Sequence, residues 1–409
     1  MSAMGGCNYF FSIYAKRLVV YSLTIRYFTI LSIIIAGVLF LQNQGAAQER
    51  SVTFEEQLVI GNQNNPPAEY LFGGPRYIRT DSENRIYITT MNNSIRVFSP
   101  DGKYLKNIGR RGKGPGEFIS ISAIAVGKND ELIAYDGRLG RLTWFYNFGD
   151  SLKSLNLTHP DWTGSDIVPL PNNQFASVEI QFPWIYEVAD IDFVDYKDRL
   201  IHLIDGDSWE KTRSLFNVYD HMMFDKEEPV EARFAMGGDY QLAKLNDTTL
   251  AITHKISDGS IYLVNTKSGY VREVQGHFAG HDSYEILEWQ YRRSYHENRY
   301  NMVTASATPN TSTLVYQIKL RSRALLANNK WLLHFVQTAE GNNTTYNIEF
   351  IDKDGNYLGY TPIRDDFTTR QDDSPVFVAM HLDNQNQLYY ADYSSGVPVI
   401  RVTKIVMEE

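Results

Sequence analysis

Residues 85–118 read RIYITTMNNSIRVFSPDGKYLKNIGRRGKGPGEF and hold the most informative pattern in the chain. Short segments rich in β-branched and aromatic residues alternate there with polar turns, as strands and hairpins require. One turn, Pro100-Asp101-Gly102, separates residues 95–98 from Tyr104 and Leu105. Gly, Asp and Asn accept the positive φ angles of tight turns. This segment therefore predicts consecutive β-hairpins.

The same unit recurs along the chain. Apolar positions eight residues apart flank an Asn-marked turn six times: Ile78 and Ile86, Ile124 and Leu132, Ile167 and Phe175, Leu242 and Leu250, Ala324 and Leu332, Met380 and Leu388. A second hairpin, usually with a Gly at its tip, follows each of the first five. Repeated hairpins that cannot bury a face alone must stack on one another, which favours a radial or solenoid fold.

The sixth unit lacks its last strand, because the chain ends soon after residues 399–402. Residues 52–60 form a strand-like segment that precedes the first unit and belongs to none. If this segment completes the last sheet, the ring closes without an open seam. We therefore predict an all-β fold, a six-bladed β-propeller of four-stranded antiparallel blades whose last blade is closed by the N-terminal strand.

Residues 85–118 resemble NHL-repeat and TolB-like six-bladed propellers. The specific part is a strand, an Asp-Gly turn and Gly-x-x-Gly-x-Gly-Pro-Gly-x-Phe at residues 109–118. Many proteins of this type are exported bacterial proteins, so the resemblance implies a fold and a compartment more than an activity.

The first residues predict export. Lys16, Arg17 and Arg26 precede an apolar run at 27–41 and then small residues, which is typical of a secretory signal peptide. We expect residues 1–47 to be removed, leaving a single domain at 48–409 in the periplasm or outside the cell. The alternative is an uncleaved membrane anchor.

Composition limits the function classes. The formal net charge is −9, which argues against nucleic acid as a partner. The single cysteine, Cys7, lies in the predicted signal peptide, so a core of the 43% hydrophobic residues must stabilise the domain without disulfides. We expect a monomer without a cofactor.

The turn lengths predict a functional face. Strands of a blade alternate in direction, so the Asn and Gly turns share one face, and long segments at 181–199, 217–237 and 276–321 share the other, here called the long-loop face. Aromatic spacing predicts a short helical insertion around 283–301. Binding sites concentrate on long loops of a rigid scaffold. The candidate ligand-binding residues on this face are Trp184, Tyr186, His221, His281, Trp289, Tyr291, Arg110 and Arg111.

Each of these candidates has a structural alternative. The aromatic residues could instead pack the insertions onto the disc, and the Gly-rich segment with Arg110 and Arg111 could be an inter-blade turn, because it lacks the helix of a phosphate loop. The leading prediction is a non-enzymatic, exported scaffold that binds a protein or a glycan through the long-loop face.

The alternative function is a metal-dependent, lactonase- or lyase-like enzyme with Ca²⁺ or Zn²⁺ at the central channel. Its ligands would be Asp136, Glu179, His254 and Asp392, which recur at equivalent positions after the second-strand anchors. The competing interpretation is that Asp136 and Asp392 accept hydrogen bonds from backbone N–H groups of the following turns. No Gly-x-Ser-x-Gly motif points to a nucleophilic serine.

Overall fold

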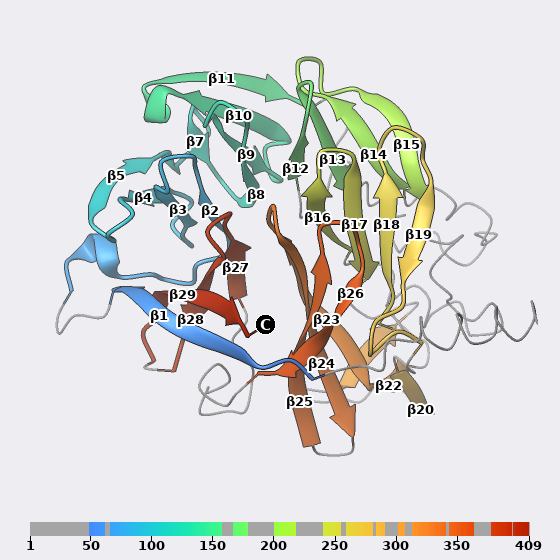
Figure 1. Cartoon of the computed structure of the whole chain (residues 1–409). Coiled ribbons are helices and arrows are strands. Elements are labelled where there is room, and N and C mark those ends of the chain that lie inside the picture. The colour runs from blue at the N-terminus through green and yellow to red at the C-terminus, as the bar shows by residue number, and fades with distance from the viewer. Residues whose placement is uncertain are drawn as a thin grey trace, which may run out of the picture. The chain divides into compact units, whose positions relative to one another are not determined.

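The computed structural model describes residues 49–61, 66–157, 167–178, 200–217, 240–254, 259–280, 284–290, 302–306, 313–340, 343–363, 378–394 and 396–408. The predicted signal peptide lies outside these residues. Six four-stranded antiparallel sheets surround a common centre (Figure 1), which confirms the predicted six-bladed β-propeller. Among the described residues, no helix has the length and apolar character needed to cross a membrane.

The blades follow the sequence order, each starting with its innermost strand. Blade 1 is β2 (Ile78–Thr80), β3 (Ile86–Thr89), β4 (Ile95–Phe98) and β5 (Tyr104–Ile108), and blade 2 is β8 (Ile121–Val126), β9 (Leu132–Asp136), β10 (Arg141–Tyr146) and β11 (Ser151–Asn156). Blade 3 is β12 (Ile167–Leu170), β13 (Gln174–Val178), β14 (Leu200–Asp205) and β15 (Lys211–Asn217), and blade 4 is β16 (Tyr240–Asn246), β17 (Thr249–His254), β18 (Ile261–Asn265) and β19 (Val271–Val274). Blade 5 is β23 (Leu320–Ala327), β24 (Trp331–Glu340), β25 (Asn343–Asp352) and β26 (Tyr357–Pro362).

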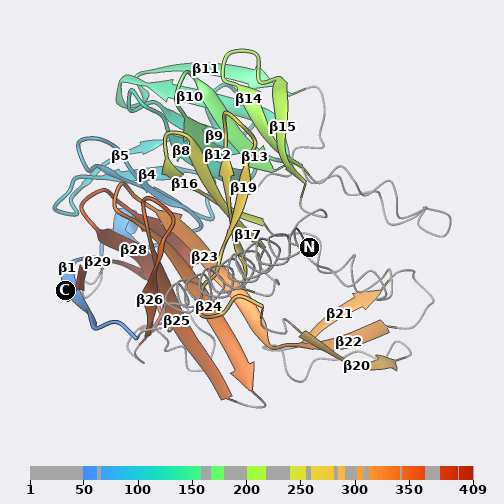
Figure 2. The same ribbon diagram turned by 45° about the vertical axis from the view of Figure 1, so that its right-hand side comes forward.

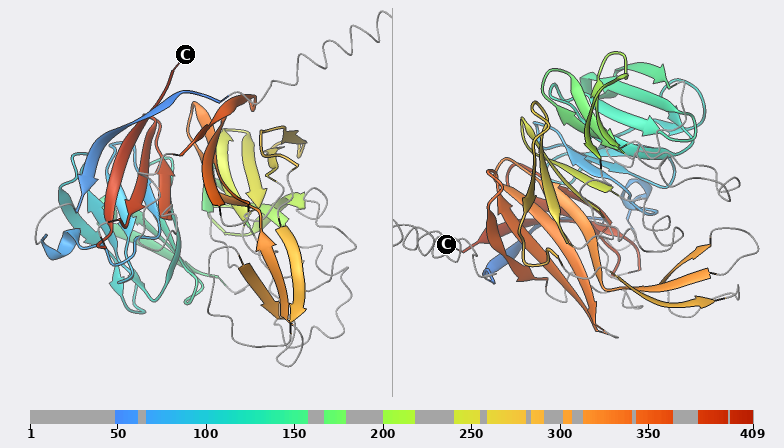
Figure 3. Two further views of the ribbon diagram at one scale, coloured as in Figure 1. Left: turned by 90° about the horizontal axis from the view of Figure 1, so that it is seen from below. Right: turned by 90° about the vertical axis from the view of Figure 1, so that its right-hand side faces the viewer.

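Blade 6 joins the two ends of the described chain. It consists of β27 (Val378–Leu382), β28 (Gln387–Asp392), β29 (Val399–Met407) and the N-terminal strand β1 (Val52–Ile60). β1 pairs antiparallel with β29 from Val52↔Met407 to Ile60↔Ile400 (Figure 3). The predicted closure by residues 52–60 is therefore confirmed, and backbone hydrogen bonds seal the ring.

Apolar clusters lie between consecutive blades all the way round. Ile78 and Phe98 of blade 1 share a cluster with Tyr389 and Ile400 of blade 6. The other interfaces hold pairs from shared clusters: Ile95 and Leu132, Trp144 and Phe175, Ile201 and Ile252, Ala251 and Leu332, Phe350 and Leu388. Full burial of one such side chain contributes about 1.5–3 kcal/mol, so the blades stabilise one another.

Short turns of neighbouring blades contact each other on one face, here called the short-turn face. The backbone N–H of Ser82 donates to Asp130 at 2.8 Å, and Asn328 Nδ2 donates to the Asp383 carbonyl at 2.7 Å. Asn84 and Asn386 have φ angles of 58° and 64°, as the Asn-marked turns predicted. The predicted grouping of the Asn turns on one face is therefore supported, whereas the long segments at 181–199 and 217–237 lie almost entirely outside the described residues.

An additional sheet follows blade 4. It contains β20 (Tyr284–Gln290), β21 (Met302–Ser306) and β22 (Thr313–Ile318) in the order β20-β22-β21 (Figure 2). The predicted helix around 283–301 is therefore wrong for its first part, while residues 291–301 lie outside the described residues. β20 finds its hydrogen-bond partner in β22, from Tyr284↔Ile318 to Gln290↔Thr313, and this non-local pairing overrides the helical spacing of the aromatic residues.

The remaining described elements are short. Two 3₁₀ helices, η1 (Ala68–Tyr70) and η2 (Asn147–Gly149), and a parallel pair, β6 (Arg110–Arg111) with β7 (Glu117–Phe118), lie in connections.

Candidate functional site

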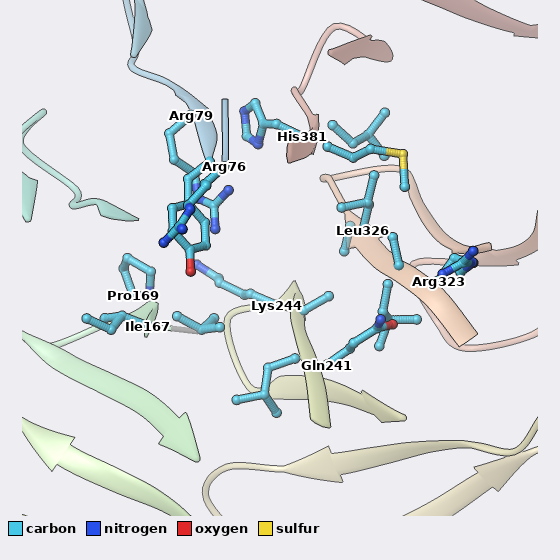
Figure 4. A pocket seen from close by; sticks show the side chains of 18 residues that line it. Arg76, Arg79, Ile167, Pro169, Gln241, Lys244, Arg323, Leu326 and His381 are labelled. Atoms are coloured by element: carbon cyan, nitrogen blue, oxygen red, sulfur yellow. The ribbon is translucent and has the colours of Figure 1, made fainter. Parts of the chain in front are cut away.

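The described residues form a pocket of about 300 Å³ at the centre of the ring. Inner strands of five blades line it, namely β2, β12, β16, β23 and β27, with Arg76 and Tyr77 just before β2 (Figure 4). A propeller places its inner strands around such a channel, where side chains from distant parts of the sequence meet. This pocket is therefore the site that the fold itself assembles.

The charged lining residues are all cationic. Arg76, Arg79, Lys244 and Arg323 line the pocket, and none of the 18 described residues that line it is an Asp or a Glu. In the view of Figure 4, Arg76, Arg79 and the ammonium group of Lys244 occupy the same side of the pocket. The apolar part of the pocket wall consists of residues such as Ile167, Pro169 and Leu326.

His381 lies beside Arg79 but is not a further cation. Its Nε2 atom lies 2.8 Å from Thr80 Oγ1. Burial, with a smaller contribution from the charge of Arg79, lowers the pKa of His381 to about 3. The imidazole is therefore neutral near pH 7, and it offers the site a hydrogen-bonding group.

The other cations differ in their partners. Lys244 Nζ lies 2.8 Å from the exposed carboxylate of Asp247, at the short-turn end of β16. Burial lowers the pKa of Arg323, whose guanidinium interacts with the Tyr346 hydroxyl. Among the described residues, the Nε atom of Arg323 has no hydrogen-bond partner.

The four predicted metal ligands do not gather within the described residues. The Asp136 carboxylate accepts hydrogen bonds from the N–H groups of Ile119, Ser120, Arg138 and Leu139 at 2.6–3.2 Å. Asp392 accepts from Ser394 N and pairs with Arg401 Nε at 2.6 Å. His254 ends β17 and is buried, and Glu179 lies outside the described residues. Over the described ranges no three metal-ligating side chains cluster, and the acids serve their own loops.

Most predicted ligand-binding residues lie outside the described residues. These are Trp184, Tyr186, His221, His281 and Tyr291. Trp289 belongs to β20, where its backbone pairs with Leu314. Their role in binding stays a prediction.

Arg110 and Arg111 lie exposed in the Gly-rich connection between blades 1 and 2. Arg110 forms an ion pair of 2.7 Å with Glu117, whose carboxylate also accepts the N–H of Gly114 at 2.8 Å. Arg141, which begins β10, donates to the carbonyls of Lys113, Gly114 and Glu117. These contacts fit the interpretation of the segment as a structural turn, with Arg111 exposed beside it.

Sequence reasoning missed a hydrogen-bond chain inside blade 5. Ser322 Oγ lies 2.7 Å from His334 Nε2, and His334 Nδ1 lies 2.7 Å from Glu349 Oε2. Glu349 Oε1 also accepts the Phe278 N–H at 3.2 Å. The order of groups matches a Ser-His-acid triad, but all three side chains are completely buried. A substrate cannot reach this serine. The three hydrogen-bonded side chains instead link β23, β24 and β25 and stabilise the blade.

The missed cationic pocket left no periodic signal. Arg79, Lys244 and Arg323 stand at different offsets from the apolar anchors Ile78, Leu242 and Ala324. Only the ring geometry brings them together.

A family model agrees with the fold, and two solved structures are similar to the chain. A protein of Bacteroides fragilis NCTC 9343, described as a candidate exported protein, is 12% identical, with a TM-score of 0.50 over 89% of this chain and 97% of its own. Virginiamycin B lyase from Staphylococcus aureus is 16% identical, with a TM-score of 0.43 over 87% of this chain and all of its own. No curated protein sequence matches the chain significantly. Residues 67–183 match a protein family described as a 6-bladed beta-propeller, in agreement with the six blades of the structure.

Proposed function

We propose that this chain is an exported, non-enzymatic binding protein, whose propeller presents the long-loop face to a protein or a glycan. The observation that carries this proposal is the asymmetry of the disc. On the short-turn face, the turn residue Ser82 donates to Asp130 in a turn of the next blade, and the side chain of Arg272 in β19 donates to the Asp354 carbonyl in a turn of blade 5. The connection between blades 4 and 5, at the opposite ends of the strands, instead contains the additional sheet β20-β22-β21.

Added structure on a rigid scaffold supports a binding role. A propeller needs only a short connection between one blade and the next, as residues 109–120 provide between blades 1 and 2. Elaborated connections on such scaffolds usually carry recognition. Aromatic residues of these connections would supply a large contact area at a low entropic cost.

We propose no catalytic role because the candidate catalytic groups already form contacts within the fold. The Ser322 hydroxyl is buried with its histidine and glutamate, and Asp136 is saturated by four backbone N–H groups. Recruiting Asp136 as a metal ligand would leave those N–H groups without their acceptor, which is costly for buried donors.

The test uses the full chain expressed with its own N-terminal segment. N-terminal sequencing of protein recovered outside the cytoplasm should start at Gln48. The purified protein is then assayed on a glycan panel, by cross-linking to extracellular proteins of its source, and by elemental analysis for metal.

Trp184→Ala and Trp289→Ala should weaken the captured interaction about tenfold or more, as the loss of an aromatic hot spot does. The matched control is Tyr270→Ala, since Tyr270 is 68% exposed in a short turn of blade 4. Equal losses in all three variants, or a stoichiometric ion lost on Asp136→Ala, would overturn the proposal.

A further inference from the structure

We infer that Glu349 of blade 5 is a positioning residue for the additional sheet β20-β22-β21. Its buried carboxylate holds residues 276–280, here called the anchor segment, which lead from β19 of blade 4 towards that sheet. The sheet belongs to the connection that we expect to carry the ligand, so this role of Glu349 deepens the proposed function and rests on it.

The anchor segment is attached to blade 5 at two consecutive residues. The backbone N–H of Phe278 donates to Glu349 Oε1 at 3.2 Å. The Phe278 side chain is 6% exposed and shares an apolar cluster with Leu320 of β23. The preceding ring, His277, stacks on Tyr360 of β26, with 4.2 Å between the ring centres and an angle of 1° between the planes. One backbone contact and two side-chain contacts therefore fix the chain shortly before the sheet begins.

The burial of Glu349 needs an explanation beyond the stability of the blade. Its side chain is completely buried, and its Oε2 atom lies 2.7 Å from His334 Nδ1. Apolar residues of similar volume often stabilise a protein as well as a buried ionic pair does, or better. An apolar residue would therefore serve the interior of the blade, but it could not accept the N–H of Phe278. This N–H is a group outside blade 5 that needs an oxygen at position 349.

Two glycines make room for the attachment. A Cβ atom on Gly276 would lie 2.5 Å from Glu349 Oε1, so the backbone passes the carboxylate only without a side chain. Gly276 N also donates to the Val274 carbonyl at 3.1 Å, which turns the chain sharply after β19. A Cβ atom on Gly259, in the turn between β17 and β18, would overlap the Phe278 carbonyl group. The anchor segment is therefore enclosed by groups of both blade 4 and blade 5.

The sheet has a second attachment where it leads into blade 5. β22 ends at Ile318 and β23 begins at Leu320, and the Lys319 carbonyl between them accepts the Ala339 N–H at 2.7 Å. A sheet held at this end alone could rotate about it, and a ligand would then have to order the sheet on binding. The anchor segment removes this freedom in advance, which lowers the entropic cost of binding.

Hydrogen exchange of the purified, processed full chain without a ligand measures the attachment. Glu349→Leu removes both oxygens, so we expect the amides of the anchor segment and of β20 to exchange about tenfold or more faster than in the parent protein. Glu349→Gln keeps an oxygen that can accept the Phe278 N–H, and these amides should exchange within about threefold of the parent rate. The matched control is Ser322→Ala, which breaks the same hydrogen-bond chain at its other end, at His334 Nε2, and should leave this exchange unchanged.

A second variant tests the attachment from the side of the anchor segment. Gly276→Ala places a methyl group against the Glu349 carboxylate and should also accelerate the exchange about tenfold or more. Its matched control is Gly73→Ala, because a Cβ atom on Gly73 would meet no atom within 4 Å. Thermal melting verifies that each variant is folded, and Gly276→Ala decides the question if Glu349→Leu fails to fold.

Spin labels measure the orientation of the sheet. The only cysteine of the chain, Cys7, lies in the predicted signal peptide, so the processed protein carries labels only where cysteines are introduced. The two labelled positions are Glu288→Cys in β20 and Lys353→Cys in an exposed turn of blade 5. We expect one narrow distance distribution in the parent background, and a distribution about twice as wide or wider with Glu349→Leu.

Three results would overturn the inference: a broad distance distribution in the parent background, unchanged exchange in Glu349→Leu, or equal acceleration by Ser322→Ala and Glu349→Leu. Exchange in Glu349→Gln as fast as in Glu349→Leu would also reject it, because the acceptor oxygen would then not be the cause. None of these measurements uses a ligand. A failure of the proposed function, seen in the capture assays, is therefore distinguishable from a failure of this inference.

Discussion

His334 Nδ1 lies 2.7 Å from Glu349 Oε2 in the middle of blade 5, and neither side chain is exposed to solvent. Removal of the imidazole leaves the buried Glu349 side chain without one of its hydrogen-bond partners, which costs about 1–3 kcal/mol. We expect His334→Leu to lower the free energy of unfolding in urea by about that amount. The double variant His334→Leu/Glu349→Leu should lose less than the two single variants together, and strict additivity would contradict this account.

Ile60 is 2% exposed at the end of β1, where its backbone pairs with Ile400 of β29. Ile60→Asp places a carboxylate in the cluster between blades 6 and 1, so we expect unfolding to become easier by about 3 kcal/mol or more. Glu55→Gln, at an exposed position of the same strand, is the control and should change stability by less than about 0.5 kcal/mol. Thermal melting measures both variants, and equal melting temperatures would argue against ring closure by β1.

Arg141 is 9% exposed and donates to three carbonyl groups of the connection between blades 1 and 2. Arg141→Met leaves these acceptors without their charged donor, so we expect a loss of about 2–4 kcal/mol in urea denaturation. Arg110→Met removes only an exposed ion pair with Glu117 and should cost less than about 1 kcal/mol. A larger loss from Arg110→Met than from Arg141→Met would reverse the assigned roles.

His381 predicts how stability changes with pH. Its pKa is about 3 in the folded protein, against an ordinary value of 6.5, so between these values the unfolded chain binds a proton that the folded chain does not. Its contribution is therefore fully present above pH 6.5 and decreases as the pH falls towards 3, by at most about 1.4 kcal/mol per pH unit.

His381→Gln removes this titration. The difference in unfolding free energy between pH 7 and pH 5 should then be smaller by about 1–2 kcal/mol than in the parent protein. Denaturation curves at the two pH values give this difference. An unchanged difference would mean that His381 titrates in the folded protein much as it does in the unfolded chain.

Much of the fold was accessible from local patterns. The anchors Ile78 and Ile86 recur with their Asn turn in every blade, and the unpaired residues 52–60 match the missing strand of the last blade. Hydrophobic alternation and turn residues are local properties, so one chain displays them directly. The pattern failed at residues 284–290, where helical spacing of aromatic residues was overridden by pairing with β22.

The candidate site was less accessible. The equivalent strand-end positions of Asp136 and Asp392 suggested a shared metal site, whereas each carboxylate is bound to its own loop. The cations of the pocket stand far apart in the sequence, from Arg76 to Arg323, with no common spacing.

The sequence by itself determined the repeated hairpin, the number of blades and the strand that closes the ring. Each follows from local patterns of apolar and turn residues, or from a strand-like segment that belongs to none of the repeats. Only the tertiary structure decided which side chains meet at the axis and which lie buried in blade 5. The reason is geometric: the direction of each inner strand's side chains depends on bulges and blade packing, and long-range contacts set these.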